Sequence, residues 1–280
     1  MRLYLSMNVS HILSFLIILL SLSACQQEKS LQFLALSHTR ICDGTGKNTL
    51  DTNIANINYA KYDLLLLGGD MLCNTSMDEA GLQHLSDVLS IEEPTTLWAI
   101  GNHDDTNTAL LSRYTQRPTY YSYHHSGITF LVLDTELDAG SISGQQLDYV
   151  NRVLDTLQRT THLIVLHHKL LWLYGNDELR GLDKTVSNVK ICEDMDWCLK
   201  PNNFNQDIYP RLTTLVRKQG IQVICIGGDI GSVAKQFEWT TKEGITLLAT
   251  GVNDDKGKNQ VLIFGFYNGE LKWFYQTVLN

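Results

Sequence analysis

Residues Leu97–Asp105 read LWAIGNHDD: four apolar residues are followed at once by a glycine and then by Asn, His and two Asp. A run that is apolar on both faces is typical of a strand buried between two layers. Glycine lets the backbone turn and approach a ligand closely, and Asn, His and Asp carry metal-binding or proton-transferring groups. The stretch predicts a buried strand whose carboxyl end carries chemistry.

Other apolar runs along the chain follow the same plan. Between several of them, apolar residues recur at helical spacing, which predicts amphipathic helices. The tail reads as strands, and Asn268-Gly269 is a strong signal for a β-hairpin. The predicted strands are Leu31–Leu36, Leu64–Leu67, Leu97–Ile100, Phe130–Leu133, Leu163–Leu166, Val223–Ile226, Phe237–Thr241, Ile245–Thr250, Gln260–Tyr267 and Glu270–Thr277, and the predicted helices are Met77–Leu89, Ile142–Leu157 and Tyr209–Lys218. An α/β order followed by antiparallel strands predicts a four-layer αββα sandwich, built as one domain over residues 31–280.

The predicted strand ends share a chemistry. In open α/β sheets, ligands bind at the carboxyl ends of the strands, and Asp and His are common ligands of divalent transition metals. Each of these residues alone would be explained as a helix cap or a polar strand end, but their joint pattern favours a site. The strand ends are Ser37–Arg40 (SHTR), Gly68–Asp70 (GGD), Gly101–Asp105 (GNHDD), His167-His168 and Gly227–Gly231 (GGDIG).

Three of these motifs carry a resemblance to a known family. Gly69-Asp70, Gly101–Asp104 and His167, in this order and at these spacings, resemble the calcineurin-like metallophosphoesterases. Tyr120–Asp134 followed by Ile142–Leu147 is similar to bacterial members. The resemblance implies the αββα fold, hydrolysis of a phosphate mono- or diester substrate, and divalent metal ions of the Mn, Fe or Zn class.

The resemblance also implies roles for single residues. Asp70 matches the carboxylate that bridges two metal ions, and Asn102 and His167 match ligands of the second ion. His103 matches the residue that contacts the phosphate and protonates the leaving group. Asp104 matches the carboxylate that positions that histidine.

The chain departs from the family at its first and last motifs. The family's Asp-x-His is replaced by His38 and Arg40, and its Gly-His-x-His by Gly228–Gly231, so that Asp229 stands where a histidine ligand is expected. Arginine stays protonated and does not bind metals, and Gly231 has no side chain.

We therefore expect one or two metal ions, and the motifs favour a single retained ion. Its expected ligands are Asp70, Asn102, His167 and Asp229. His38 would bind metal weakly or contact phosphate, and Arg40 would hold phosphate in place of the lost ion. The spacing does not decide whether Asp43 is a replacement ligand.

Three functions stay open at this point: a metal-dependent phosphoesterase, a non-enzymatic protein that binds a phosphorylated ligand or partner, and a structural lipoprotein. The composition of the chain excludes one class of binding partner. Asp+Glu total 30 against 22 Lys+Arg, a formal charge of −8. An acidic chain is not expected to bind nucleic-acid duplexes independently of sequence.

The N-terminus predicts export. The apolar stretch Ile12–Leu22 is too short to span a bilayer comfortably and has the length of a signal-peptide core. It ends in Leu22–Cys25 (LSAC), which resembles the bacterial lipobox, so residues 1–24 are predicted to be a signal peptide and residues 25–30 a tether lipidated at Cys25. Gln26 after it resembles the outer-membrane sorting pattern. We expect a protein of the bacterial cell envelope, lipid-anchored in the outer membrane and facing the periplasm.

An oxidising compartment allows disulfides. Cys192 and Cys198 lie six positions apart and could close a loop. Cys42 and Cys73 each follow a predicted strand by a few residues and could pair if those strands are neighbours. Cys225 lies within an apolar run and is expected to be a buried thiol. Spacing alone does not fix the connectivity.

Overall fold

The computed structural model describes residues 30–40, 42, 48–188, 198–253 and 258–278. Leu31–Asn280 forms one compact unit. The predicted signal peptide, Cys25, Asp43 and Cys192 lie outside the described residues. Within the described part of the chain, no helix is long and apolar enough to cross a membrane.

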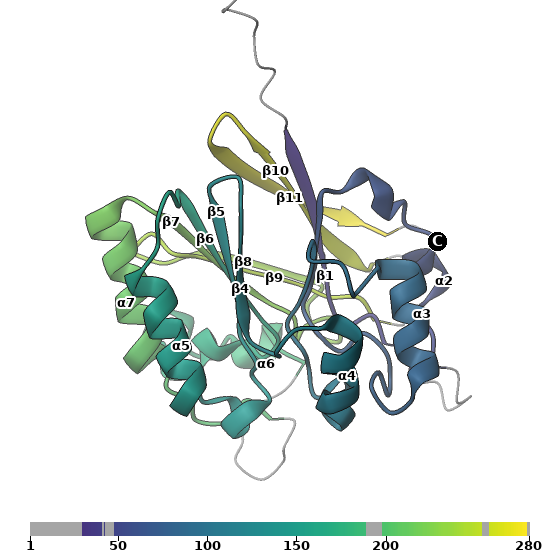
Figure 1. Cartoon of the computed structure of the whole chain (residues 1–280). Helices are drawn as coiled ribbons and strands as arrows, with labels where there is room; N and C mark the ends of the chain where they lie inside the picture. Colours follow the sequence, from purple (N-terminus) through teal and green to yellow (C-terminus); the bar gives the residue numbers. More distant parts are fainter. Residues whose placement is uncertain (1–29, 41, 43–47, 189–197, 254–257, 279–280) are drawn as a thin grey trace, which may run out of the picture. The chain divides into compact units, whose positions relative to one another are not determined.

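Two mixed β-sheets lie face to face between layers of helices (Figure 1). Within the described residues, the first sheet has the order β11-β10-β1-β2-β3 and the second β4-β5-β6-β7-β9-β8. The first comprises β1 (Leu31–Leu36), β2 (Leu64–Leu67), β3 (Thr96–Trp98), β10 (Gln260–Tyr267) and β11 (Glu270–Thr277). The second comprises β4 (Tyr121–His125), β5 (Ile128–Val132), β6 (His162–His167), β7 (Gln222–Gly227), β8 (Gln236–Thr240) and β9 (Thr246–Thr250).

Helices cover the outer face of each sheet, as Figure 1 shows. Helices α2 (Thr52–Ala55), α3 (Glu79–Leu89) and α4 (Thr108–Thr115) lie on the first sheet, and α5 (Gly144–Asp155) and α7 (Tyr209–Thr214) on the second. The short helix α6 (Asp183–Val186) belongs to the long connection after β6. The predicted αββα sandwich is confirmed.

The core between the sheets follows from the alternation of strand side chains. Phe33 of β1 stacks on Phe264 of β10 with ring centroids 4.9 Å apart, and meets the edge of Phe130 of β5 across the gap between the sheets at 5.8 Å. All three rings are fully buried. Because both faces of each central strand are covered, these strands read as continuous apolar runs.

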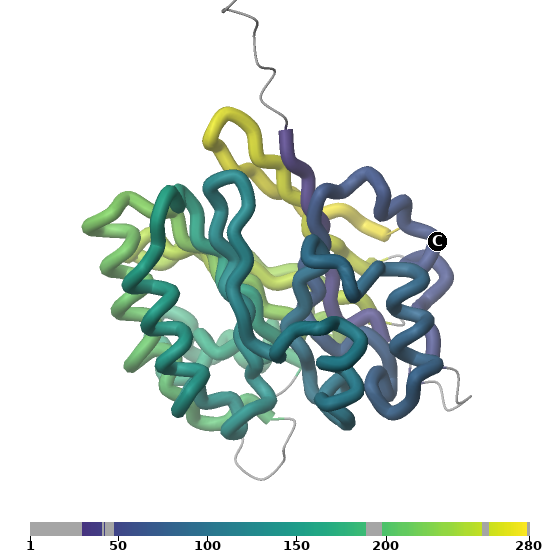
Figure 2. The backbone as a smooth tube through the Cα atoms, viewed as in Figure 1, coloured from purple at the N-terminus to yellow at the C-terminus, as the bar shows by residue number. Residues whose placement is uncertain are grey.

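The C-terminal strands return to the first strand of the domain. β10 pairs antiparallel with β1, and β10 and β11 are joined by Asn268-Gly269, both at positive φ. Figure 2 traces this return, in which the yellow tail lies beside the purple β1. The Asn-Gly hairpin expected from sequence is present because this dipeptide tolerates the left-handed conformation that the turn requires.

The predicted helix Tyr209–Lys218 has a more irregular form. The α-helical turn covers Tyr209–Thr214, and π-helical turns cover Phe204–Ile208 and Leu215–Gln219 on either side. The left-handed Gly220, at φ 68°, ends the segment as expected of a C-terminal glycine.

Candidate functional site

The parallel strands β1, β2 and β3 of the first sheet and β6 and β7 of the second present their carboxyl ends to one another. Gly68 and Gly228 make this approach close: a Cβ on Gly228 would lie 1.8 Å from the carbonyl oxygen of Gly68. Backbone bonds link the loops, from His38 N to Gly69 O at 2.9 Å and from Gly228 N to His168 O at 2.9 Å. The two sheets therefore bring their polar strand ends into one site.

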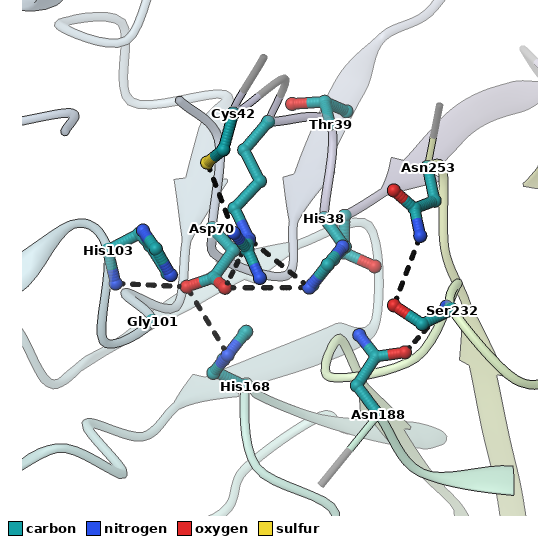
Figure 3. A network of polar contacts seen from close by, with 12 residues as sticks. His38, Thr39, Cys42, Asp70, Gly101, His103, His168, Asn188, Ser232 and Asn253 are labelled. Atoms are coloured by element: carbon teal, nitrogen blue, oxygen red, sulfur yellow. Dashed lines mark hydrogen bonds and ion pairs between the residues drawn. The ribbon is translucent and has the colours of Figure 1, made fainter. Parts of the chain in front are cut away.

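Asp70 lies at the centre of this site and is almost fully buried (Figure 3). Its Oδ2 is 3.1 Å from Arg40 Nε, and its Oδ1 accepts a hydrogen bond from the His103 backbone N–H at 3.1 Å. His168 Nε2 lies 3.5 Å from Oδ1, and His38 Nε2 lies 3.6 Å from Oδ2. Burial opposes the charge of Asp70, but the neighbouring charges, His168 first, outweigh it and hold its pKa below the ordinary value.

Both Asp70 and His38 adopt the left-handed backbone conformation, at φ 55° and 54°. This conformation costs a non-glycine residue about 1–2 kcal/mol. Strain of this kind persists where the surrounding structure fixes it, and it clusters at functional sites. The two strained residues are among those that the sequence motifs singled out.

The Arg40 guanidinium occupies one side of Asp70. Besides the carboxylate, Nε contacts His38 Nε2 at 3.3 Å, and Nη1 lies 3.2 Å from Cys42 Sγ. Burial lowers the pKa of His38 to about 3, so its imidazole is neutral and its Nε2 faces the guanidinium as an acceptor. Arg40 thus places a positive charge directly on Asp70 Oδ2.

His168, and not His167, approaches Asp70 on the other side. Along β6, Leu163 and Val165 face the helices, whereas Ile164 and Leu166 face the other sheet. Alternation therefore turns His167 toward the helices, where its ring meets the edge of Trp172 at 4.6 Å. Its Nδ1 bonds Lys169 O at 2.6 Å, and burial lowers its pKa to about 3.

The neighbouring residue, His168, is the histidine of this pair that faces Asp70. His168 Nδ1–H donates to Gly68 O at 2.7 Å, which directs Nε2 toward Asp70. Burial disfavours the charged ring, but Asp70, Asp229 and Glu136 raise the pKa of His168 to about 8.

Asp229 is buried at the end of β7, where its backbone N–H donates to His168 O at 3.0 Å. Burial raises the pKa of its carboxyl, and the charge of Asp70 adds to this effect. Asn102 lies half-buried in the turn after β3. The structure thus places Asp229 near the charges of Asp70 and His168, with Asn102 on the neighbouring loop.

Asp104 has a different role from the expected one. Its carboxylate accepts hydrogen bonds from the backbone N–H groups of Asp70 at 2.7 Å, Gly101 at 2.9 Å and Met71 at 3.1 Å, and from the Thr75 hydroxyl. It does not hold the His103 ring, whose Nδ1 bonds Cys73 O at 2.7 Å instead. Asp104 fixes the loops after β2 and β3 to each other and so positions Asp70.

A buried ion pair borders the site and was not expected from the sequence. Lys169 Nζ lies 2.7 Å from Glu136 Oε2, and both side chains are almost fully buried. Burial raises the pKa of Glu136 to about 7, although Lys169 opposes the shift. No motif signalled Glu136, because it lies in the turn after β5 among other acidic residues.

Among the described residues, Asp70, His168 and Asp229 do not bring three ligand atoms within 4.8 Å of one another, so their side chains would have to close around an ion. His168 Nε2 and Asp229 Oδ2 are buried without a hydrogen-bond partner within the described residues, and the same holds for His167 Nε2 and His38 Nδ1. Arg40 already neutralises Asp70 Oδ2, which disfavours a metal ion on that oxygen. Gly231 also adopts φ 129°, and a Cβ on it would lie 2.8 Å from Val252 O, so a histidine would not be accommodated without a backbone shift.

The disulfide expected between Cys42 and Cys73 is present, with Cα atoms 5.3 Å apart. Because β1 and β2 are neighbours, their following loops lie side by side. Cys198 is disulfide-bonded, while its expected partner Cys192 lies outside the described residues. Cys225 is a buried free thiol, as expected.

The fold is metallophosphoesterase-like. A dimetal phosphatase from Danio rerio superposes with a TM-score of 0.58 at 12% identity, over 89% of this chain and 96% of that chain. GAP50, described as the anchor in the inner membrane complex of Plasmodium, superposes with a TM-score of 0.55 at 12% identity, over 89% of this chain and 85% of the other. No protein-family model and no curated protein sequence matches this chain. The resemblance that the sequence motifs indicated is thus confirmed at the level of the fold.

Proposed function

We propose that this protein is a phosphoesterase that hydrolyses a phosphate mono- or diester with a single divalent metal ion and with Arg40 in the place of a second. The observation that carries the proposal is the asymmetric surrounding of Asp70. A guanidinium lies on one carboxylate oxygen, and an imidazole nitrogen without a hydrogen-bond partner lies beside the other.

The ion would be held by Asp70, His168 and Asp229, with Asn102 on the adjacent loop. Carboxylate and imidazole ligands suit the Mn, Fe and Zn class of ions. A divalent ion supplies positive charge that polarises a phosphoryl oxygen and acidifies a water molecule.

Arg40 and His103 supply the remaining chemistry. A quarter of the Arg40 side chain surface is exposed, so the guanidinium can contact a phosphate oxygen while Nε stays on Asp70. His103 donates from Nδ1 to Cys73 O, because a carbonyl accepts only. Its Nε2 can then carry a proton to the leaving oxygen, an effect worth about 10²–10⁴-fold in rate.

Hydrolysis of a generic aryl phosphate and of its diester, with Mn²⁺, Fe²⁺ or Zn²⁺ supplied singly, tests the proposal. We expect turnover that falls at least about 100-fold in His103→Ala and is lost in Asp70→Asn. The matched control is His124→Ala, which removes an exposed imidazole on β4 and should keep full activity. Turnover that is absent with every ion, or equal in all variants, would contradict the proposal.

A second candidate is a protein that binds a phosphorylated ligand or partner without turning it over. The contact of Arg40 with Asp70 favours it, because the guanidinium neutralises the carboxylate at the position of the first ion. This candidate predicts binding of a fluorescent phosphate ester that Arg40→Gln weakens, with no hydrolysis under any metal. Hydrolysis that depends on His103 would exclude it.

The location proposed for this activity is the periplasmic face of the outer membrane, with Cys25 lipidated. Labelled palmitate should be incorporated by the full chain in a bacterial host and not by Cys25→Ser. A chain that fractionates with membranes equally well after this substitution would contradict the anchor.

A further inference from the structure

Beside Asp70, on the same rim, lies a group of residues that the proposed hydrolytic site does not use as metal ligands. Among the described residues, Cys42, Cys73 and His103 are the group of three His, Cys or carboxylate residues whose ligand atoms all lie within 4.8 Å of one another. Cys42 is exposed, and Cys73 and His103 are half-buried. An ion could therefore reach them from solvent.

Their arrangement is held by contacts on both sides. The His103 ring is fixed by its Nδ1–H bond to the carbonyl of Cys73 itself, at 2.7 Å. Arg40 Nη1 lies 3.2 Å from Cys42 Sγ. A neighbouring guanidinium stabilises the thiolate form of a cysteine, and the thiolate is the form that binds metals.

The two sulfurs are joined in a disulfide in this structure. We propose that reduction of the Cys42–Cys73 disulfide creates a metal site of two thiolates and the His103 imidazole, which takes Zn²⁺ or a similar borderline-soft divalent ion. Two sulfur ligands and one nitrogen ligand leave the fourth tetrahedral position open for water or an exogenous ligand. The inference stands on this cluster and holds whether or not the chain hydrolyses phosphate esters.

The chemistry balances with an external reductant. A dithiol or phosphine gives two electrons to the S–S bond, which breaks, and solvent protons complete two thiols. The dithiol becomes a disulfide, or the phosphine takes an oxygen from water and becomes a phosphine oxide. The binding of the ion then displaces both thiol protons to solvent.

Sulfur ligation distinguishes this site from the one at Asp70. The ligands proposed around Asp70 offer only oxygen and nitrogen, so Co²⁺ bound there has no thiolate-to-metal charge-transfer band. Co²⁺ bound by Cys42 and Cys73 does. The band therefore distinguishes thiolate ligation from an ion bound at Asp70, and the double serine variant below separates Cys42 and Cys73 from the other thiols.

The test is a Co²⁺ titration of the full chain, reduced with a phosphine that is then removed under anaerobic conditions. We expect the band to saturate at one ion per chain, to be absent in the oxidised protein, and to disappear in Cys42→Ser/Cys73→Ser. This double variant keeps the remaining cysteines and is the matched control for their binding. Zn²⁺ should displace Co²⁺ and abolish the band.

The His103→Ala variant distinguishes a folded three-ligand site from thiols that bind Co²⁺ in an unfolded chain. We expect it to weaken Co²⁺ binding at least 10-fold and to change the shape of the band. If reduction merely unfolds the chain, the thiols bind without the imidazole, and the band survives His103→Ala unchanged. That result, or an equal band in the double serine variant, or no band at all in the reduced chain, overturns the proposal.

One consequence rests on the proposed function, because the hydrolytic site uses the same His103. An imidazole that binds a metal cannot carry a proton to a leaving group. Substoichiometric Zn²⁺ should therefore inhibit the reduced protein and spare both the oxidised protein and Cys42→Ser/Cys73→Ser. Equal sensitivity of all forms would contradict this coupling, and a lack of hydrolysis in every form would contradict the proposed function while leaving the Co²⁺ result intact.

Discussion

Asp104 is predicted to hold the site together through its carboxylate rather than through the His103 ring. Asp104→Asn keeps the volume of the side chain but replaces one acceptor oxygen with an NH₂ group. In the structure each oxygen accepts two hydrogen bonds: Oδ2 from the N–H groups of Asp70 and Gly101, and Oδ1 from Met71 N–H and the Thr75 hydroxyl. In the variant, the NH₂ group therefore faces two buried hydrogen-bond donors and can accept a bond from neither.

The magnitude follows from these contacts. A hydrogen bond to a charged group contributes about 1.5–3 kcal/mol, and a buried donor left without a partner costs about 1–3 kcal/mol. Two donors lose their acceptor at a fully buried position. Since neighbouring contacts are not additive, we expect Asp104→Asn to lower the free energy of unfolding by about 3–5 kcal/mol. Natural domains have only about 5–15 kcal/mol in total.

Urea denaturation followed by tryptophan fluorescence measures this loss. Asp87→Asn is the matched control, because Asp87 is an exposed helix residue that bonds the Gln83 side chain, and it should change stability by no more than about 0.5 kcal/mol. Thr75→Val removes one of the four donors to Asp104 and should fall between the two. A loss in Asp104→Asn no larger than in Asp87→Asn would refute the role given to this carboxylate.

Two further predictions concern the charges around Asp70, and a third concerns the backbone at Gly231. In metal-free protein the raised pKa of His168, about 8, means that its contribution to stability is fully present below pH 6.5 and is lost as the pH rises through 8. In chelator-treated protein, the free energy of unfolding should fall by about 2 kcal/mol over this pH range. The fall should be absent in His168→Gln, and also after loading with Mn²⁺, because the ion takes the place of the proton. Arg40→Gln should weaken the binding of inorganic phosphate at least about 10-fold, because it removes a charge-assisted donor; Arg40→Lys should recover only part of it, since lysine lacks the fork, and calorimetric titration decides. Gly231→His should lower stability by about 1–3 kcal/mol in thermal denaturation, because φ 129° strains any side chain, and should add no second metal ion; a second ion with unchanged stability would contradict the argument from the backbone.

Much of the fold was readable from the sequence, because the central strands are buried on both faces. The predicted runs Leu31–Leu36 and Leu64–Leu67 coincide with β1 and β2, and the hairpin strands Gln260–Tyr267 and Glu270–Thr277 coincide with β10 and β11. The disulfide between Cys42 and Cys73 was predicted only on condition that their strands are neighbours, and the pairing of β1 with β2 meets that condition.

The same property made the site harder to predict. A strand that is apolar on both faces does not show which residues point to which layer. The choice of His167 therefore rested on the family resemblance, whereas the structure turns His168 toward Asp70. A one-residue shift exchanges the two faces, and the packing of β6 between the helices and the other sheet sets which face His167 takes. The bond of Asp104 to three backbone groups and the pairing of Lys169 with Glu136 also leave no trace in residue spacing, because they depend on how the loops close.

The measurement that tests the account most directly is a crystal structure of the full chain soaked with Mn²⁺, with an anomalous difference map collected for manganese. The account predicts one peak at the site, bounded by Asp70, His168 and Asp229, with Arg40 still in contact with Asp70. Two peaks that share Asp70, with the Arg40 side chain displaced, would contradict the single-ion site, and so would a map without any peak beside Asp70.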